Sequence, residues 1–138
     1  MFVDASVVVA ILAKESGWEE LLKRIADVDG QLYISALVRL EATLALGRVN
    51  AGAKKPTPGM LSAARNLVDA FIVEIDARNV TINEDIGGRA IDASIRYSKA
   101  VGHPADLNFG DCFSYACAKA LDVPLLFKGN DFLKTDLA

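Results

Sequence analysis

The fold is decided by the opening stretch Met1-Phe-Val-Asp-Ala-Ser-Val-Val-Val-Ala10. Its short apolar run, residues 1–3, predicts a buried strand that ends at Asp4. A helix is expected to follow at once, over about residues 6–14. A strand that passes directly into a helix is the repeating unit of parallel α/β sheets.

The rest of the chain repeats this alternation. We expect further strands at residues 31–34, 71–75 and 124–127, and helices at 18–26, 35–48, 58–70, 83–100 and 108–121. A loop rich in glycine and proline, residues 50–59, is too short to separate two domains. The pattern predicts a single domain over residues 1–138, with helices on both faces of a mostly parallel sheet.

Composition excludes several classes of protein. A chain of 138 residues can bury a core without a disulfide or a structural metal. Cys112 and Cys117 point away from each other on a helix, so we expect two free thiols. No apolar run approaches the roughly 18–20 residues of a membrane span. The N-terminus has no basic lead-in to resemble a signal peptide, so we expect a cytoplasmic protein without membrane contact.

The net charge of −3 argues against a globally basic nucleic-acid binder. One segment differs from the rest, because between residues 39 and 65 the chain carries five basic residues and one acid, a local charge of +4 (five minus one). The basic residues are Arg39, Arg48, Lys54, Lys55 and Arg65. This segment could face phosphates, and a solvated surface is the equally simple alternative.

Three acids stand where a strand is expected to end or a helix to begin: Asp4, Asp111 and Asp131. Each has an ordinary explanation alone, as a helix cap or a turn residue. Together they would meet beyond the carboxyl ends of parallel strands, where such sheets bind ligands.

Glu41 is harder to explain as an ordinary solvent-exposed residue. Its neighbours on the predicted helix 35–48 are Leu37, Leu44 and Ala45, so its carboxylate needs a cation or a basic partner such as Arg39 or Arg48. Four convergent carboxylates would repel one another unless a cation neutralised them. Oxygen ligands indicate Mg²⁺ or Mn²⁺, and the chemistry such an ion supports is phosphodiester hydrolysis.

Four segments resemble, in order, the motifs of VapC-type PIN-domain toxins. They are Phe2-Val-Asp4-Ala-Ser6-Val-Val-Val-Ala, Ser35-Ala-Leu-Val-Arg-Leu-Glu41-Ala, Leu107-Asn-Phe-Gly-Asp111-Cys-Phe-Ser-Tyr-Ala and Lys128-Gly-Asn-Asp131-Phe. The third motif is the most specific, and the match runs from residue 2 to residue 132. Single motifs of this kind are weak, whereas four in order are strong.

This resemblance implies a PIN-like three-layer α/β/α fold and the toxin component of a type II toxin–antitoxin module. Such toxins are bacterial or archaeal ribonucleases that cleave RNA, often tRNA or rRNA, with Mg²⁺ or Mn²⁺. They are usually homodimers, and a VapB-type antitoxin inhibits them by threading its C-terminal segment over the site, where it can place an arginine. Asp4, Glu41 and Asp111 match the core acids, Asp131 matches the more variable fourth acid, and Ser6 matches a Ser or Thr position near the metal.

Two other functions stay open from the sequence. A phosphatase that forms an aspartyl-phosphate would want a second Asp two residues after Asp4, and this chain has Ser6 there. A non-catalytic PIN-like module that only binds RNA or a partner would be expected to have lost one or more of the four acids, and all four are present.

Overall fold

The computed structural model describes residues 1–137 and contains a four-stranded sheet in the order β3-β2-β1-β4. Its strands are β1 (Phe2–Val3), β2 (Tyr33–Ser35), β3 (Arg78–Val80) and β4 (Leu125–Leu126). All the neighbouring strands run parallel, with Phe2 in register with both Tyr33 and Leu125. Parallel pairing brings every carboxyl end to the same edge of the sheet.

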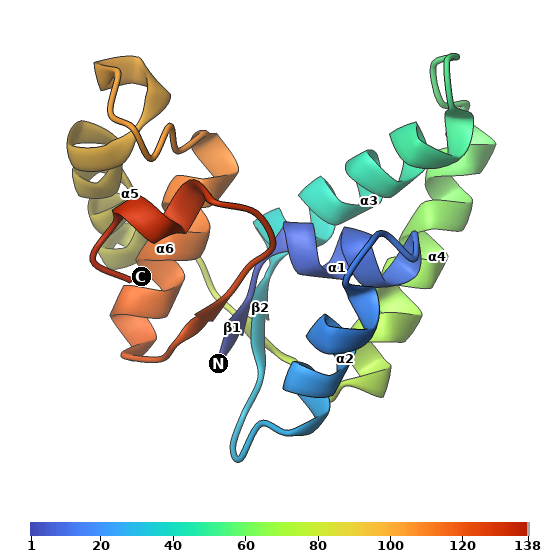
Figure 1. Ribbon diagram of the computed structural model, residues 1–138, viewed down its shortest axis with the longest axis horizontal. Coiled ribbons are helices and arrows are strands. Elements are labelled where there is room, and N and C mark those ends of the chain that lie inside the picture. The colour runs from blue at the N-terminus through green and yellow to red at the C-terminus, as the bar shows by residue number, and fades with distance from the viewer. Residues whose placement is uncertain (138) are drawn as a thin grey trace.

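Helices cover both faces of this sheet. They are α1 (Ala5–Leu12), α2 (Trp18–Ala26), α3 (Ala36–Ala51), α4 (Pro58–Glu74), α5 (Glu84–Tyr97) and α6 (Phe109–Leu121), with short 3₁₀ turns η1 (Lys99–Val101) and η2 (Asp131–Lys134). Helices α1–α4 lie on one side of the strands, and α5 and α6 lie on the other (Figure 1). The predicted three-layer α/β/α fold with a parallel sheet is confirmed.

Polar side chains fix where the helices begin. Asp4, Ser35, Thr57, Asn83 and Asn108 are the N-caps of α1, α3, α4, α5 and α6, and each side chain accepts a hydrogen bond from a backbone N–H of its helix. These bonds satisfy amides that no helix carbonyl can reach. Two of the caps, Asp4 and Ser35, follow or end a strand, so the turn from strand into helix is held at the edge of the sheet.

The core forms around β1 and α1. Phe2, Val3, Val7 and Val8 are completely buried. Helix α1 can be apolar nearly all round because it packs against α2, α3 and α4. The two thiols, Cys112 and Cys117, are buried and free, as expected. Within residues 1–137, no helix is long and apolar enough to cross a membrane.

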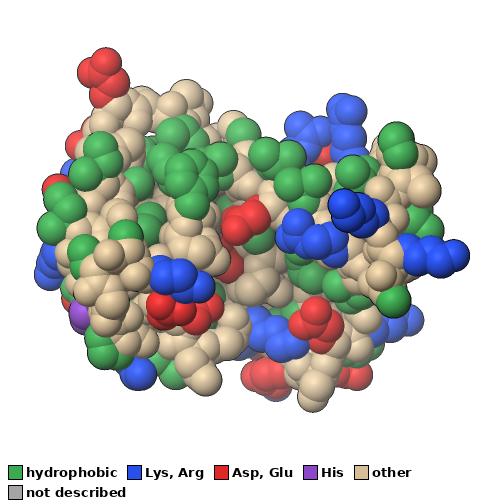
Figure 2. Space-filling model, turned by 90° about the horizontal axis from the view of Figure 1, so that it is seen from above, with side chains coloured by type: hydrophobic (Ala, Val, Ile, Leu, Met, Phe, Trp, Pro, Cys, Tyr) green, Lys and Arg blue, Asp and Glu red, His purple; other side chains and the backbone are tan. Residues whose placement is uncertain are grey.

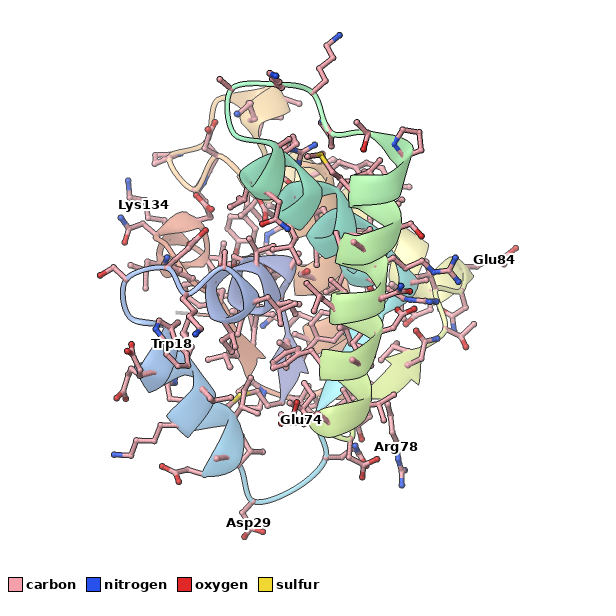
Figure 3. The ribbon with its side chains drawn as sticks, turned by 90° about the vertical axis from the view of Figure 1, so that its right-hand side faces the viewer. Trp18, Asp29, Glu74, Arg78, Glu84 and Lys134 are labelled. Atoms are coloured by element: carbon pink, nitrogen blue, oxygen red, sulfur yellow. The ribbon has the colours of Figure 1, made fainter. Side chains whose placement is uncertain are left out.

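The strand expected at residues 71–75 is wrong. Helix α4 continues through Glu74, and the strand begins only at Arg78, at the foot of that helix (Figure 3). The buried residues of α4 are Ala64, Val68 and Phe71, at i, i+4 and i+7, which is helical spacing. Packing of that stripe outweighs the local preference of an apolar, β-branched run for a strand.

Helix α5 also ends earlier than expected. We placed its end near residue 100, but it stops at Tyr97, and Ser98 caps the separate turn η1. Ser98 also pairs with Leu107 in an isolated parallel bridge, and this bridge draws the chain across to the start of α6.

Candidate active site

A cavity of about 450 Å³ opens at the carboxyl edge of the sheet. Figure 2 looks onto this edge, and acidic side chains lie in the hollow between the two halves of the molecule. The lining includes all five residues predicted for the site, which are Asp4, Ser6, Glu41, Asp111 and Asp131. They come from four segments that are far apart in the sequence.

Asp4 is the most firmly held of the four acids. One carboxylate oxygen accepts hydrogen bonds from the Ser6 amide at 2.9 Å and the Ser6 hydroxyl at 2.6 Å, and the other accepts from the Ser114 hydroxyl at 2.7 Å. The Ser6 hydroxyl oxygen in turn accepts from the Lys128 amide at 3.0 Å. This chain of bonds ties the end of β1 to α6 and to the segment after β4, so folding fixes the orientation of Asp4.

Asp111 is held by a capping box, as its position in the sequence predicted. Its carboxylate accepts from the Asn108 amide at 2.8 Å, while the Asn108 side chain accepts from the Asp111 amide at 3.0 Å. Burial raises the pKa of Asp111 to about 6, with smaller contributions from the charges of Asp4 and Asp131, while the bond from Asn108 opposes the shift. The carboxylate is therefore fixed in space but short of compensating positive charge.

Glu41 reaches the cavity from α3 and lies against α6. Its carboxylate fills the space where a side chain at Gly110 would begin, so any Cβ at that position would overlap it. Burial raises the pKa of Glu41 to about 7, the charges of Asp4 and Asp111 add to the rise, and Arg48 opposes it. In the described part of the chain, the Glu41 carboxylate has no hydrogen-bond donor.

The environment predicted for Glu41 on α3 is wrong. The apolar neighbours of Glu41 on α3 are not core residues, since Leu44 is 36% exposed and Leu37 and Ala45 are only partly buried. The buried residues of α3 are Val38, Ala42, Leu46 and Gly47. Both stripes have helical spacing, and the packing of α3 on α1 and α4 selects the second.

The partner suggested for Glu41 is also revised. Arg39 donates two hydrogen bonds to Asp69 of α4, at 2.5 and 2.7 Å, and does not serve Glu41. Arg48 lines the cavity and acts on Glu41 through its charge, without a close ion pair between them. Glu41 therefore lies half-buried at the edge of the cavity.

Asp131 is the least constrained acid. It begins η2, its side chain is exposed, and its charge raises the pKa of the neighbouring Asp111. The four carboxylates share one cavity but are not drawn together around a common point. Among residues 1–137, no three acidic, cysteine or histidine side chains are arranged to hold an ion in this conformation.

Sequence reasoning missed two groups that shape the cavity. Ser114 follows Asp111 by three residues and therefore lies on the same face of α6, a spacing that could have identified it. Gly110 left no comparable signal, because its importance depends on how closely α3 approaches α6. Lys128 belongs to the fourth motif, but the sequence did not predict the hydrogen bond from its backbone amide to Ser6.

The fold and the cavity together define a class, that of parallel α/β domains which gather carboxylates beyond the carboxyl ends of their strands. The family model of the PIN domain matches residues 1–137, and the chain belongs to this family.

Comparison with curated proteins narrows the class to VapC ribonucleases. A VapC ribonuclease of Rhizobium meliloti is 52% identical over 139 residues, which cover 99% of this chain and 98% of that protein. Ribonuclease VapC42 of Mycobacterium tuberculosis is 33% identical, over 99% of this chain and 96% of its own length. The resemblance to VapC-type PIN-domain toxins is thereby confirmed.

A solved structure gives the same fold. The crystal structure of Mycobacterium tuberculosis VapC20, described as a Sarcin-Ricin loop cleaving toxin, aligns with a TM-score of 0.71. The alignment covers 96% of this chain and 92% of that one at 17% identity. At that identity the likeness bears on the fold alone.

Proposed function

We propose that this chain is the toxin ribonuclease of a type II toxin–antitoxin module and hydrolyses RNA phosphodiester bonds with Mg²⁺ or Mn²⁺. The observation that carries the proposal is the meeting of Asp4, Glu41, Asp111 and Asp131 in one cavity at the carboxyl edge of the sheet. All four offer oxygen ligands, and among residues 1–137 neither cysteine nor histidine lines the cavity. Such a donor set fits a hard divalent ion and not zinc.

The chain's own residues have separate tasks in this reaction. When bound, the ion would activate a water molecule and neutralise charge on the phosphate. Asp4 and Asp111, already oriented by hydrogen bonds, would provide fixed ligands, and Glu41 and Asp131 would complete the set from the opposite wall and the mouth. The Ser6 hydroxyl orients Asp4 by donating to it at 2.6 Å.

The proposal extends to the partners. Relatives named VapC ribonucleases support an RNA substrate, for which we propose tRNA or ribosomal RNA, met in the cytoplasm of a bacterial or archaeal cell. They also support a VapB-type antitoxin that covers the cavity. A peptide arginine would suit a cavity whose described lining has five acids and two basic residues.

We further propose a homodimer. An apolar groove of about 760 Å³ runs between α5 and α6, and at its rim Ile91 is 64% exposed and Phe109 73% exposed. Hydrophobic side chains gather on this half of the molecule in Figure 2. Exposed apolar surface of this kind marks interaction sites. Light scattering should give twice the chain mass for wild type and the single mass for Ile91→Asp, and a monomeric wild type would contradict the proposal.

The decisive test is RNA cleavage under metal titration. Wild type should cleave RNA in Mg²⁺ or Mn²⁺, and Asp4→Asn should lose activity by about 100-fold or more, because it removes a fixed ligand charge. Asp69→Asn is the control, since Asp69 lies on the outer side of α3 and α4 and binds Arg39. Equal cleavage by wild type and Asp4→Asn would contradict the assignment.

The same experiment separates the two rival functions. A phosphatase would hydrolyse a small phosphate monoester and leave RNA intact, and a non-catalytic module would bind RNA without cutting it. As a readout independent of activity, Mg²⁺ or Mn²⁺ should raise the melting temperature of wild type more than that of Asp4→Asn.

A further inference from the structure

The five basic residues of the α3–α4 region fall into two groups in the structure. Arg39 is bonded to Asp69, and Arg65 lies 3.6 Å from the same carboxylate. One acid therefore offsets these two cations on the outer side of the two helices. Neither of them faces the acidic cavity.

Arg48, Lys54 and Lys55 form the second group. Within residues 1–137, none of them has an acidic side chain within 4.0 Å, and all three are exposed. Arg48 lines the acidic cavity itself. Lys54 and Lys55 follow at the turn between α3 and α4, the far end of the hairpin that rises from the edge of the sheet in Figure 1.

Arg48 is placed to serve a ligand that occupies the cavity. It follows Glu41 by seven residues, so it lies on nearly the same face of α3 and about 10 Å further along the helix. In the described part of the chain, the other basic residue that lines the cavity is Lys128, and its ammonium is bonded to Glu15 at 2.5 Å. Arg48 is thus the lining cation that remains available to a phosphate.

We propose that the RNA strand leaves the acidic cavity along α3, with Arg48 binding a backbone phosphate a few nucleotides from the cleaved bond. Lys54 and Lys55 bind phosphates beyond it. This inference rests on the proposed ribonuclease function.

Charge explains why this route is favoured. The protein has a net charge of −3, and five of its carboxylates line the cavity, so a polyanion needs local positive charge to approach it. On the α6 side, the residue after the cavity-lining Asn108 is the exposed, apolar Phe109, and Lys99 of η1 is paired with Asp106. In Figure 2, more Lys and Arg side chains lie on the half of the molecule formed by α1–α4 than on the half formed by α5 and α6.

The test compares Arg48→Gln with Arg65→Gln, an exposed arginine of α4 outside the cavity. Cleavage of single-stranded RNA in Mn²⁺ should show KM raised about 10-fold in Arg48→Gln, with kcat within about 2-fold of wild type, because one charged phosphate contact is lost. Arg65→Gln should retain the wild-type KM. Both variants should keep the wild-type melting temperature, since both side chains are exposed.

A binding measurement checks the contact without catalysis. In an Asp4→Asn background, the dissociation constant of a fluorescent single-stranded RNA is measured against salt concentration. Arg48→Gln should reduce the slope of log K against log salt by about 0.7, and Lys54→Gln with Lys55→Gln by up to about twice that. Arg65→Gln should leave the slope unchanged.

The outcomes separate the two proposals. If wild type cleaves RNA but Arg48→Gln keeps the wild-type KM and salt slope, the strand takes another path and this inference is wrong. The same holds if Arg65→Gln weakens binding as much as Arg48→Gln does. If wild type cleaves no RNA in either metal, the proposed function itself fails. If Arg48→Gln weakens only antitoxin binding, the contact belongs to a protein partner and the inference is overturned.

Discussion

The two sides of the acidic cavity differ in how their carboxylates are held. On one side, Asp4 and Asp111 are fixed by hydrogen bonds from serine hydroxyls and backbone amides. On the other, Glu41 and Asp131 accept no hydrogen bond within residues 1–137. The difference teaches that folding alone orients Asp4 and Asp111, whereas it leaves the carboxylates of Glu41 and Asp131 without hydrogen-bond donors from the described residues.

The largest expected effect on RNA cleavage comes from moving the Glu41 carboxylate by a substitution at Gly110. Ala at this position would displace the Glu41 carboxylate, and a displacement of about 1 Å can cost about 100-fold in rate. The free energy of unfolding should change by less than about 1 kcal/mol, because a flexible side-chain end moves and Ala favours helix. RNA cleavage and urea unfolding of Gly110→Ala measure both quantities.

Gly47→Ala is the matched control. Its Cβ would lie 2.5 Å from a methyl group of Leu61, in the packed contact between α3 and α4. We expect it to lower the free energy of unfolding by about 1–3 kcal/mol and to leave the activity of the folded fraction intact. If Gly110→Ala cleaved RNA at the wild-type rate, the position of the Glu41 carboxylate would not matter for cleavage. The contrast between the two sides of the cavity would then have no functional consequence.

The next largest effect is expected where hydrogen bonds hold Asp4. Ser114→Ala removes a hydroxyl that donates to Asp4 in a buried setting, which should lower the free energy of unfolding by about 1–2 kcal/mol. Cleavage should fall about 10-fold as Asp4 loses its orientation. Ser62→Ala on the exposed side of α4 should change neither quantity. An unchanged melting temperature for Ser114→Ala would mean that Asp4 is held by Ser6 alone.

A smaller effect concerns pH in the metal-free protein. The pKa of Glu41 is about 7 in the folded state against an ordinary 4.5, so the folded state binds the proton more tightly. The stabilisation that the folded state gains by binding this proton is therefore fully present below about pH 4.5, and it is lost as the pH rises towards 7. Glu41→Gln should be more stable than wild type by about 1 kcal/mol at pH 8, a value reduced for its partial exposure, and equal to it at pH 4. Urea unfolding in a chelator at both pH values checks this; equal stability at pH 8 would contradict it.

The smallest effect is expected at Asp131. Its side chain is exposed and unbonded, so Asp131→Asn should reduce RNA cleavage by less than about 10-fold, well below the loss for Asp4→Asn. Parallel kinetic assays of the two variants decide the ranking. If Asp131→Asn lost as much RNA cleavage as Asp4→Asn, the exposed acid would matter as much as the buried one, and this ranking would be wrong.

Much of the fold could be predicted from residues that act locally. Asp4 and Asn83 cap helices because of chemistry within three residues of themselves, and Asn108 with Asp111 forms a capping box readable from four letters. The third strand could not be predicted. Two of its three residues, Arg78 and Asn79, are exposed, so it has no apolar signal, whereas the apolar run before it belongs to α4.

For the site, the sequence singled out four acids that the structure places in one cavity, and the reason given for one of them was wrong. Glu41 was chosen because its helical neighbours are apolar, yet Leu44 proves to be exposed and Leu37 and Ala45 only partly buried. Which stripe of α3 turns inward depends on its packing against α1 and α4, and a single helix does not encode that choice. The roles of Gly110 and Ser114 likewise depend on contacts between segments about 70 and 110 residues apart.

The Ser6 hydroxyl joins Asp4 to the Lys128 amide, so the orientation of Asp4 depends on the pairing of the edge strand β4. If β4 frays from β1, the Lys128 amide loses its acceptor and Asp4 loses its alignment in the same event. Hydrogen exchange at the Lys128 amide then reports the fraction of molecules with an assembled site. Local separation of β1 and β4 would in this way convert molecules with an aligned Asp4 into molecules without one, while the helices stay folded.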